Sequence, residues 1–482
     1  MGDTHTRPAP KRIAARAGVV FEQDGLLVVA LAVFAIVLLV SLRRSLGGDG
    51  WLALLVGRLI VQHGLPSHDS LTVMAHGRSW ADEQWLGQLS LYGLWRVGGI
   101  KLVLLVHALL SVGTFTGAAL IARRHGATAR SVTWVAIPAF VAYFPVGDVM
   151  RTQSFALPLF TATLWLLLDD ARRPSRRVFA TLPLLVLWAN LHGSVVLGAG
   201  LVALAGLLTM ARARRVSPRG LTLTLLPWTC MLASPYAVHL PAYYKTVLAG
   251  GDFSHFITEW VPTTLQLATI PLFILVLGGC WLLGRNHGVL PAFDQLAFLA
   301  MAVIAFQAIR NVAWFALVAL AVLPPLLDRL RAPVDEPRRL NRILSLSLLA
   351  IAAVAVGGVA AKPTQWFAHS FPPAAASATA RVAGPHGLVF ATSTYPDWLM
   401  WSEPQLTGRV AFDSRVELLR HAQFEEIGRI LNAAGDWRVS LRRYDVFVLN
   451  PGPDAAFEHA LRHDLAARVV FSSPQVVVLR RR

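Results

Sequence analysis

Three carboxylates lie in a long loop that follows the first apolar run of the chain. They are Asp69, Asp82 and Glu83, and aromatic residues surround them over residues 66–94. A carboxylate in such a loop can act as a general base and take the proton of an attacking hydroxyl. Asp69 and Glu83 are the two candidate bases, and Asp82 is a candidate for substrate binding. A turn or a helix N-cap is an equal alternative for Asp69 and the favoured one for Asp82.

Two arginines are candidates for binding an anionic group near these acids. Arg310 interrupts a long apolar run, where a purely structural helix has little reason to carry a guanidinium. Arg151 lies in the sequence DVMRTQSF, in which Asp148 is an alternative partner for it. Arginine remains charged and binds phosphate oxygens through two parallel hydrogen bonds. The sequence therefore makes Arg151 and Arg310 candidates for binding an anionic group, with snorkelling to lipid headgroups as the alternative for Arg310.

Two further segments carry polar residues between apolar runs. The sequence WANLHGSVVLG contains Asn190 and His192, and this imidazole could hydrogen-bond a phosphate or an acceptor. A structural role at a helix end is the alternative. The sequence ITEWVP contains Glu259 and Trp260, which could bind ligand hydroxyls while the indole stacks on a ring. A solvated acid beside an interfacial aromatic residue is the slightly favoured alternative there.

Apolar runs supply the elements that must position these residues. The chain has 482 residues, 55% of them hydrophobic, and its mean hydropathy is +0.54. A membrane-spanning helix needs about 20 mainly apolar residues. The sequence therefore predicts an α-helical polytopic membrane protein with about 11 transmembrane helices. The predicted spans lie near residues 26–42, 101–121, 131–147, 154–169, 178–191, 194–211, 221–235, 265–284, 289–309, 311–327 and 343–361.

Charge gives the expected orientation of these spans. Cytoplasmic loops carry an excess of Lys and Arg, and the basic clusters of this chain fit a cytoplasmic tail at 1–25 and an extracytoplasmic C-terminus. Arg43 and Arg44 are an exception, since they follow the first span on the outer side. The run at 26–42 lacks a cleavage site and should remain as an anchor. The net charge of +17 thus reflects topology signals, and no basic stripe for nucleic acid is present.

Two regions outside the spans have their own patterns. The first extracytoplasmic loop covers residues 43–100 and contains two candidate helices, an amphipathic one at 51–63 and another at 85–95. Residues 362–482 alternate short β-rich runs with helical stretches, which predicts a small extracytoplasmic α/β domain. Its expected strands are 387–391, 409–412, 445–449, 468–471 and 475–479, and 416–433 is an expected helical stretch. Cys230 and Cys280 lie in apolar runs and indicate packing residues rather than a disulfide framework.

The predicted topology places many ionisable side chains at the outer ends of helices. Charged groups near the hydrocarbon are costly, so they normally face a cavity and pair with each other or with a ligand. Five separate segments supply such groups to one side of the membrane, which favours a single site over scattered ion pairs. The residues are Asp69, Asp82, Glu83, Asp148, Arg151, His192, Glu259 and Arg310.

In layout, residues 20–361 resemble the GT-C superfamily of polytopic membrane glycosyltransferases. The long first loop, the acid that follows Pro66-Ser67-His68 and the polar residues gathered outside carry this resemblance. The W-x-N-x-H-G pattern around His192 and the stretch 395–418 resemble bacterial GT-C-like membrane proteins in particular, although Pro396-Asp397 stands where a glycine pair is usual. Asp413 and Arg415 in that stretch could bind a glycan or, more simply, pair with each other.

The resemblance implies transfer of a sugar from a polyprenyl-phosphate donor to a cell-envelope acceptor outside the bacterial cytoplasmic membrane. It implies Asp69 or Glu83 as base, with inversion at the sugar, and Arg151, His192 and Arg310 around the phosphate. No cofactor is expected, and a divalent cation on Asp69, Asp82 and Glu83 is the alternative. A flippase of lipid-linked sugars and a non-catalytic scaffold in envelope assembly are the rival functions.

Overall fold

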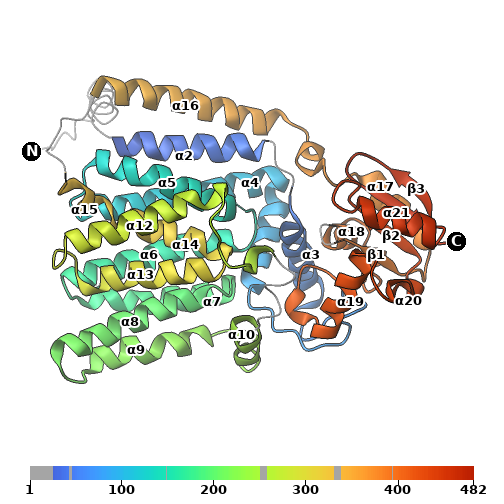
Figure 1. Ribbon diagram of the computed structural model, residues 1–482, viewed down its shortest axis with the longest axis horizontal. Helices are drawn as coiled ribbons and strands as arrows, with labels where there is room; N and C mark the ends of the chain where they lie inside the picture. The colour runs from blue at the N-terminus through green and yellow to red at the C-terminus, as the bar shows by residue number, and fades with distance from the viewer. Residues whose placement is uncertain (1–24, 43–45, 148, 250–257, 331–337, 393–394) are drawn as a thin grey trace, which may run out of the picture.

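The computed structural model describes residues 25–42, 46–147, 149–249, 258–330, 338–392 and 395–482. Helices form an elongated bundle, and a small α/β unit covers one end of it (Figure 1). The helices are α2 (Gly25–Ser41), α3 (Gly48–His63), α4 (Trp85–Arg124), α5 (Ala129–Gly147), α6 (Gln153–Arg172), α7 (Thr181–Leu191), α8 (Val195–Ala213), α9 (Pro218–Met231), α10 (Leu240–Ala249), α12 (Ile270–Arg285), α13 (Ala292–Gln307), α14 (Val312–Val322), α15 (Pro324–Asp328) and α16 (Arg338–Ala361).

Six helical segments among the described residues are long and apolar enough to cross a membrane, namely α4, α5, α6, α8, residues 267–285 and α16. All eleven apolar runs predicted from the sequence coincide with helices, but the number of spans is not confirmed. Helix α7 has 11 residues. At a rise of about 1.5 Å per residue, a helix of that length covers only about half of the hydrocarbon core.

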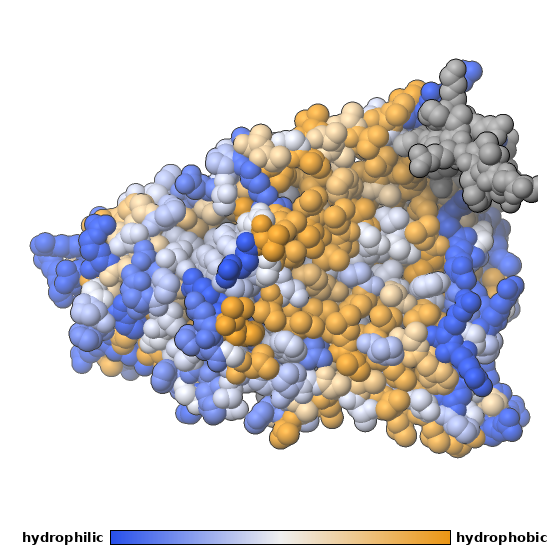
Figure 2. Space-filling view, turned by 180° about the vertical axis from the view of Figure 1, so that it is seen from behind, coloured by the Kyte–Doolittle hydropathy of each residue, from blue (hydrophilic) through white to orange (hydrophobic). Residues whose placement is uncertain are grey.

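The outer surface of the bundle is apolar and both of its ends are polar. Figure 2 shows hydrophobic residues gathered over the helices, with hydrophilic residues at the two extremities of the molecule. Many large apolar side chains on this surface are exposed, including Trp134, Leu277 and Val354. An exposed apolar surface of this kind indicates contact with lipid. The fold is therefore that of a polytopic membrane protein.

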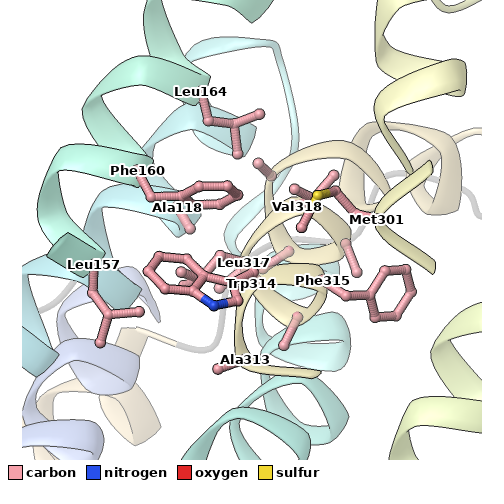
Figure 3. Packing of buried hydrophobic residues seen from close by; sticks show 14 of the residues in the cluster. Ala118, Leu157, Phe160, Leu164, Met301, Ala313, Trp314, Phe315, Leu317 and Val318 are labelled. Carbon is pink, nitrogen blue, oxygen red and sulfur yellow. The ribbon is translucent and has the colours of Figure 1, made fainter. Parts of the chain in front are cut away.

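Helix α14 lies at the centre of the bundle, and all of its residues are buried. Its Trp314 packs against Phe160 of α6 with ring centroids 5.1 Å apart (Figure 3), and against Trp188 of α7 at 5.8 Å. Neighbouring helices thus pack around an entirely apolar one, as the unbroken hydrophobic run at 312–322 requires.

Ion pairs join the basic helix ends that lie opposite the α/β unit. Arg124 at the end of α4 pairs with Asp169 of α6, and Arg172 at the end of α6 pairs with Asp294 of α13. These contacts place several of the predicted cytoplasmic turns at one end of the bundle. The polar segments that the sequence assigned to the outer side, around Arg151, His192 and Arg310, lie at the other end, near α3 and α10 (Figure 1).

The first loop folds into two helices. The predicted helix at 51–63 is found as α3, and the one at 85–95 forms the first part of α4. Helix α4 then kinks at Gly98 and Gly99 before it enters the apolar run. Gly99 has φ 61° and ψ −161°, a conformation that only glycine adopts at low cost.

The C-terminal unit contains a four-stranded sheet in the order β1-β2-β4-β3. Strands β1 and β2 are parallel, and the other pairs are antiparallel. Four of the five predicted strands are present, but 409–412 forms only isolated bridges through Val410, and 416–433 is divided by a break at 419–420. The elements are α17 (Pro373–Ala383), β1 (Val389–Ala391), α18 (Pro396–Ser402), η7 (Val416–Leu418), α19 (His421–Leu431), α20 (Trp437–Ser440), β2 (Val446–Leu449), α21 (Ala455–Asp464), β3 (Arg468–Ser472) and β4 (Val477–Arg480).

The first loop and the C-terminal unit share one hydrophobic core. Trp51 and Leu71 of the loop pack in the same buried cluster as Trp398 and Val446. The backbones also meet, since the amide of Val73 donates to the carbonyl oxygen of Val410 at 2.9 Å. Residues separated by more than 300 positions in sequence thus form a single structural unit above the bundle.

Candidate functional site

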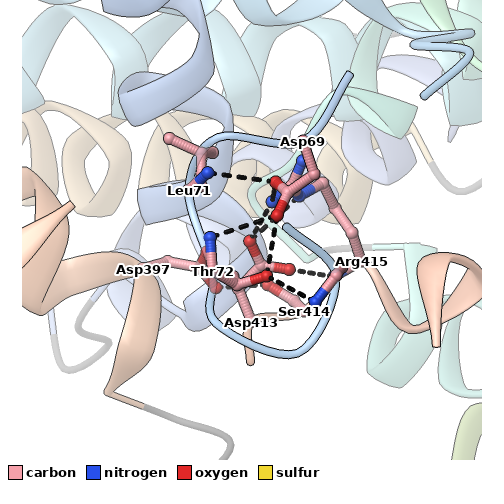
Figure 4. Close-up of polar contacts among 8 residues, drawn as sticks. Asp69, Leu71, Thr72, Asp397, Asp413, Ser414 and Arg415 are labelled. Atoms are coloured by element: carbon pink, nitrogen blue, oxygen red, sulfur yellow. Dashed lines mark hydrogen bonds and ion pairs between the residues drawn. The ribbon is translucent and has the colours of Figure 1, made fainter. Parts of the chain in front are cut away.

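Asp69 lies in the interface between the first loop and the C-terminal unit. Its carboxylate accepts hydrogen bonds from the backbone amides of Leu71 and Thr72, both at 3.1 Å, and from Thr72 Oγ1 at 2.8 Å. Arg415 Nη2 lies 2.5 Å from Asp69 Oδ1 (Figure 4). The local bonds are those of an Asx turn, so the turn interpretation of Asp69 describes its geometry.

The ion pair with Arg415 keeps Asp69 charged. Burial alone would raise the pKa of Asp69, but the guanidinium of Arg415 and the hydrogen bonds from Thr72 and Leu71 bring it below its usual value. Asp413 pairs with the same guanidinium, and Trp80 lies beneath it with its ring centroid 4.1 Å from Cζ. A carboxylate with a lowered pKa and engaged oxygens is a weak base. This geometry favours a structural role for Asp69.

Glu83 has different surroundings, just before the start of α4. Tyr243 of α10 donates a hydrogen bond from Oη to Glu83 Oε1 at 2.7 Å. A side chain at Gly193 would come within 3.2 Å of Glu83 Cγ, so the carboxyl group packs closely against the turn that follows His192. Burial, and secondarily the charge of Asp82, raises the pKa of Glu83 to about 7. A carboxyl group with this pKa can exchange a proton at neutral pH, as general base catalysis requires.

Asp82 is fully buried beside Glu83. Its Oδ1 accepts a hydrogen bond from Gln88 Nε2 at 3.0 Å, while Oδ2 has no partner among the described residues. Burial raises the pKa of Asp82 to about 7. The predicted N-cap of Asp82 corresponds to one weak contact, in which the backbone amide of Gln84 donates to Asp82 Oδ1 at 3.4 Å.

Asn190 and His192 lie in the turn between α7 and α8. The amide of Asn190 is used within the fold, since its Oδ1 accepts from Trp85 Nε1 at 2.8 Å and its Nδ2 donates to the carbonyl of Ala233 at 2.7 Å. His192 Nδ1 accepts from the backbone amide of Ser194 at 3.1 Å. Burial, and then the charges of Arg310 and Arg151, hold the pKa of His192 well below its usual value. The imidazole is therefore neutral, with its hydrogen assigned to Nε2.

Arg151 is almost completely buried between two acids. Its Nη1 donates to Glu259 Oε2 at 2.8 Å and to Asp49 Oδ2 at 3.1 Å. Its Nε and Nη2 are buried without a partner among the described residues. Two of its nitrogens therefore remain available for a further acceptor.

Arg310 lies in the break between α13 and α14, where the backbone at Ala308 becomes extended. Its guanidinium stacks on Trp260, with Cζ 4.4 Å from the ring centroid. Within the described segments, no acid pairs with it and no hydrogen bond uses its nitrogens. An arginine that stacks on an indole while its donors stay free is suited to binding a phosphate group.

The structure thus brings together most of the residues predicted from the sequence. Glu83, Arg151, His192, Glu259, Trp260 and Arg310 lie at one end of the bundle, with Asn190 and Asp82 supporting the turn and the loop. Asp69 belongs to a separate hydrogen-bond network, and Asp148 lies outside the described residues. A cavity of about 400 Å³ lies elsewhere, beside Asp445 and Arg480 in the C-terminal unit. Among the described residues, no group of three His, Cys, Asp or Glu side chains could hold a metal ion.

Three residues of this region were not singled out from the sequence. Asp49 lies in the first turn of α3, Tyr243 lies in the sequence SPYAVHLPAYY, and Glu417 lies in the C-terminal unit. Asp49 had a signal, because it is the first acid after the first span. Nothing in the sequence connects Glu417 with a loop more than 300 residues earlier.

Comparison of the fold with solved structures shows what it is similar to. ArnT from Cupriavidus metallidurans in the apo state matches with a TM-score of 0.54 and 16% identity, over 97% of this chain and 98% of that one. The same protein bound to undecaprenyl phosphate gives 0.51 and 15%, over 94% and 97%. The oligosaccharyltransferase of Archaeoglobus fulgidus gives 0.50 and 12%, over 89% and 71%.

By sequence, the chain matches no protein-family model and no curated protein. The structural matches nevertheless cover nearly all of it, and they are polytopic GT-C glycosyltransferases. The GT-C fold predicted from the sequence is confirmed.

Proposed function

We propose that this protein is a membrane glycosyltransferase that moves a sugar from a polyprenyl-phosphate donor to a cell-envelope acceptor outside the bacterial cytoplasmic membrane. The observation that carries the proposal is the guanidinium of Arg310, which lies on Trp260 near the neutral His192 and the acid Glu83 and has no acidic partner among the described residues. Cationic and neutral donors lie near Glu83 there, and transfer from a phosphate leaving group to a hydroxyl requires both donors and a base. The fold supports the same proposal, because ArnT, which shares it, was solved with undecaprenyl phosphate bound.

In the proposed reaction Glu83 is the general base. The acceptor hydroxyl attacks the anomeric carbon of the sugar, its proton passes to Glu83, and the bond between that carbon and the phosphate oxygen breaks. The electron pair of this bond leaves with the polyprenyl phosphate. A single displacement from the face opposite the phosphate inverts the anomeric centre.

The leaving phosphate gains negative charge as the bond breaks. Arg310 would donate hydrogen bonds to its oxygens together with Nε and Nη2 of Arg151, which have no partner among the described residues, and His192 would donate through Nε2. Glu259 accepts a hydrogen bond from Arg151 and so holds it in place. The next residue, Trp260, stacks against Arg310. Asn190 and Asp82 act by fixing the turn and the loop. A divalent cation is not needed for this charge balance, since the donor carries one phosphate.

The test is to incubate the purified protein with a panel of polyprenyl-phosphate sugars and to measure released polyprenyl phosphate. Release that depends on an added acceptor supports the proposal. Movement of intact donor between bilayer leaflets without release would instead identify a flippase. Absence of both release and movement would leave a scaffold as the function.

A further inference from the structure

The C-terminal unit reaches the proposed site through η7. This short helix, Val416–Leu418, contacts α10, the helix whose Tyr243 donates to Glu83. It carries Glu417, a half-buried acid. Glu83 and η7 therefore contact the same helix from different parts of the chain.

Bonds to the first loop fix the backbone on both sides of Glu417. Two residues earlier, Arg415 pairs with Asp69, and only 2% of the Arg415 side chain is exposed. One residue later, the carbonyl oxygen of Leu418 accepts a hydrogen bond from Arg78. Asp69 and Arg78 belong to the same loop as Glu83, so the position of Glu417 is fixed relative to that acid.

Electrostatics agree with this placement. Burial, followed by the charge of Glu83, raises the pKa of Glu417 to about 8. In the part of the chain that the structure describes, no side chain forms an ion pair with the Glu417 carboxyl group, and the backbone amide of Glu417 itself is the hydrogen-bond donor near it. Two neighbouring carboxyl groups cannot both ionise easily, so one of them retains a proton.

We propose that Glu417 is a positioning residue of the C-terminal unit that forms a carboxyl pair with Glu83 and shares one proton with it at neutral pH. Its part in catalysis rests on the proposed glycosyl transfer. In the resting pair Glu83 is ionised and Glu417 is protonated. After Glu83 takes the proton of the acceptor, both are neutral, and the pair releases one proton to water before the next turnover. Ionisation of both would place a second negative charge near the leaving phosphate.

Other titratable groups lie around the two carboxyl groups, and their protonation must be known before a titration of the pair can be interpreted. Burial raises the pKa of Tyr243 and Tyr244 well above the neutral range, so both remain protonated. Burial raises the pKa of Asp82 to about 7, so an Asp82→Asn background removes its absorption from each titration. The groups that act on the pair are Asp82, Tyr243, Tyr244, Arg310, Asp413 and Arg415.

The first experiment does not need activity. Infrared titration of the full chain measures the absorption of protonated carboxyl groups against pH. The band of Glu417 is the one that Glu417→Gln removes, and it should remain in Glu425→Gln, a matched change at an exposed acid of α19. In Glu83→Gln the midpoint of this absorption should fall by about one pH unit, because a neighbouring negative charge is lost. An unchanged midpoint would overturn the pair.

The second experiment follows transfer as a function of pH. The wild type should lose activity above about pH 8, where Glu417 ionises. Glu417→Gln, which stays neutral, should keep its neutral-pH rate within about threefold and lose this alkaline decline. Retention of the decline in Glu417→Gln would refute the positioning role. If the wild type shows no transfer at all, the proposed function fails, whereas the infrared result still decides whether the pair exists.

Discussion

Glu83 lies against Gly193 and accepts a hydrogen bond from Tyr243, whereas Asp69 is paired with Arg415. The two acids are 14 positions apart in the same loop. Their pKa values nevertheless shift in opposite directions, because one is buried beside another acid and the other beside a guanidinium. Environment, rather than position in the loop, therefore selects Glu83 as the proposed base.

Transfer activity should rise with pH through about 7. A general base must be unprotonated, and burial raises the pKa of Glu83 to about 7, so the ionised fraction increases across that range. The measurement is kcat/KM against pH at saturating donor, with Glu425→Gln as the control. An acid limb near pH 4, the ordinary range of a carboxylate, would contradict this assignment.

For single residues, the sequence predicted which side chains belong to the candidate site better than it predicted which side chains they contact. Arg310 and His192 could be chosen because polar groups that interrupt apolar runs are costly without a use. The partner of Asp69 could not be chosen, since Arg415 lies 346 residues away and only the folded chain brings them together. For the same reason Glu417 was missed.

Helix α4 connects the first loop to the bundle and depends on its kink at Gly99. Gly99→Ala should lower the free energy of unfolding by about 1–3 kcal/mol, because residues with a side chain strain at this φ and ψ. Gly93→Ala is the matched control in the same helix, where nothing lies within 4 Å of the added carbon. Thermal unfolding of both purified variants in detergent measures the difference. Equal stability of the two would mean that the kink needs no glycine.

The Asp69–Arg415 ion pair joins the first loop to the C-terminal unit. Asp69→Asn should cost about 1.5–3 kcal/mol, because the buried guanidinium loses one of its two carboxylate partners and keeps Asp413. Asp464→Asn, which removes an exposed pair with Arg438, should cost less than about 1 kcal/mol. Thermal unfolding compares the two. Loss of transfer in Asp69→Asn at unchanged stability would instead return Asp69 to the role of base.

Elements were predicted well where one pattern was long and uninterrupted. Every apolar run coincided with a helix because membrane-length hydrophobicity permits few alternatives. The number of spans was less accessible, since breaks at His192 and Ala308 shorten helices by amounts that hydropathy does not show. The prediction of a strand at 409–412 was wrong, because this segment pairs with Thr72 of the first loop and with Val389 only through isolated bridges.

The whole molecule separates basic turns at one end from the polar site and the C-terminal unit at the other (Figure 1). This separation is what the positive-inside rule requires of a chain whose N-terminus is cytoplasmic. In the orientation that we propose, the C-terminal unit lies outside the membrane, and it shares a hydrophobic core with the first loop.

Thiol labelling in intact cells measures this orientation. In a background with Cys230→Ser and Cys280→Ser, an impermeant reagent should label Ser472→Cys in β3. It should label Arg177→Cys, before α7, only after the membrane is permeabilised. Both positions are exposed, so accessibility of the side chain does not limit either reaction. The reverse pattern would place the site on the cytoplasmic side.

The central claim is that cations at the helix ends hold a donor phosphate while Glu83 takes the proton of the acceptor. Binding of polyprenyl phosphate and release from the bound donor, measured on the same samples, test it most directly. Glu83→Gln should bind like the wild type and lose at least about a hundredfold in release. Arg310→Gln should lose binding at least about tenfold. Wild-type release by Glu83→Gln, or wild-type binding by Arg310→Gln, would contradict the account.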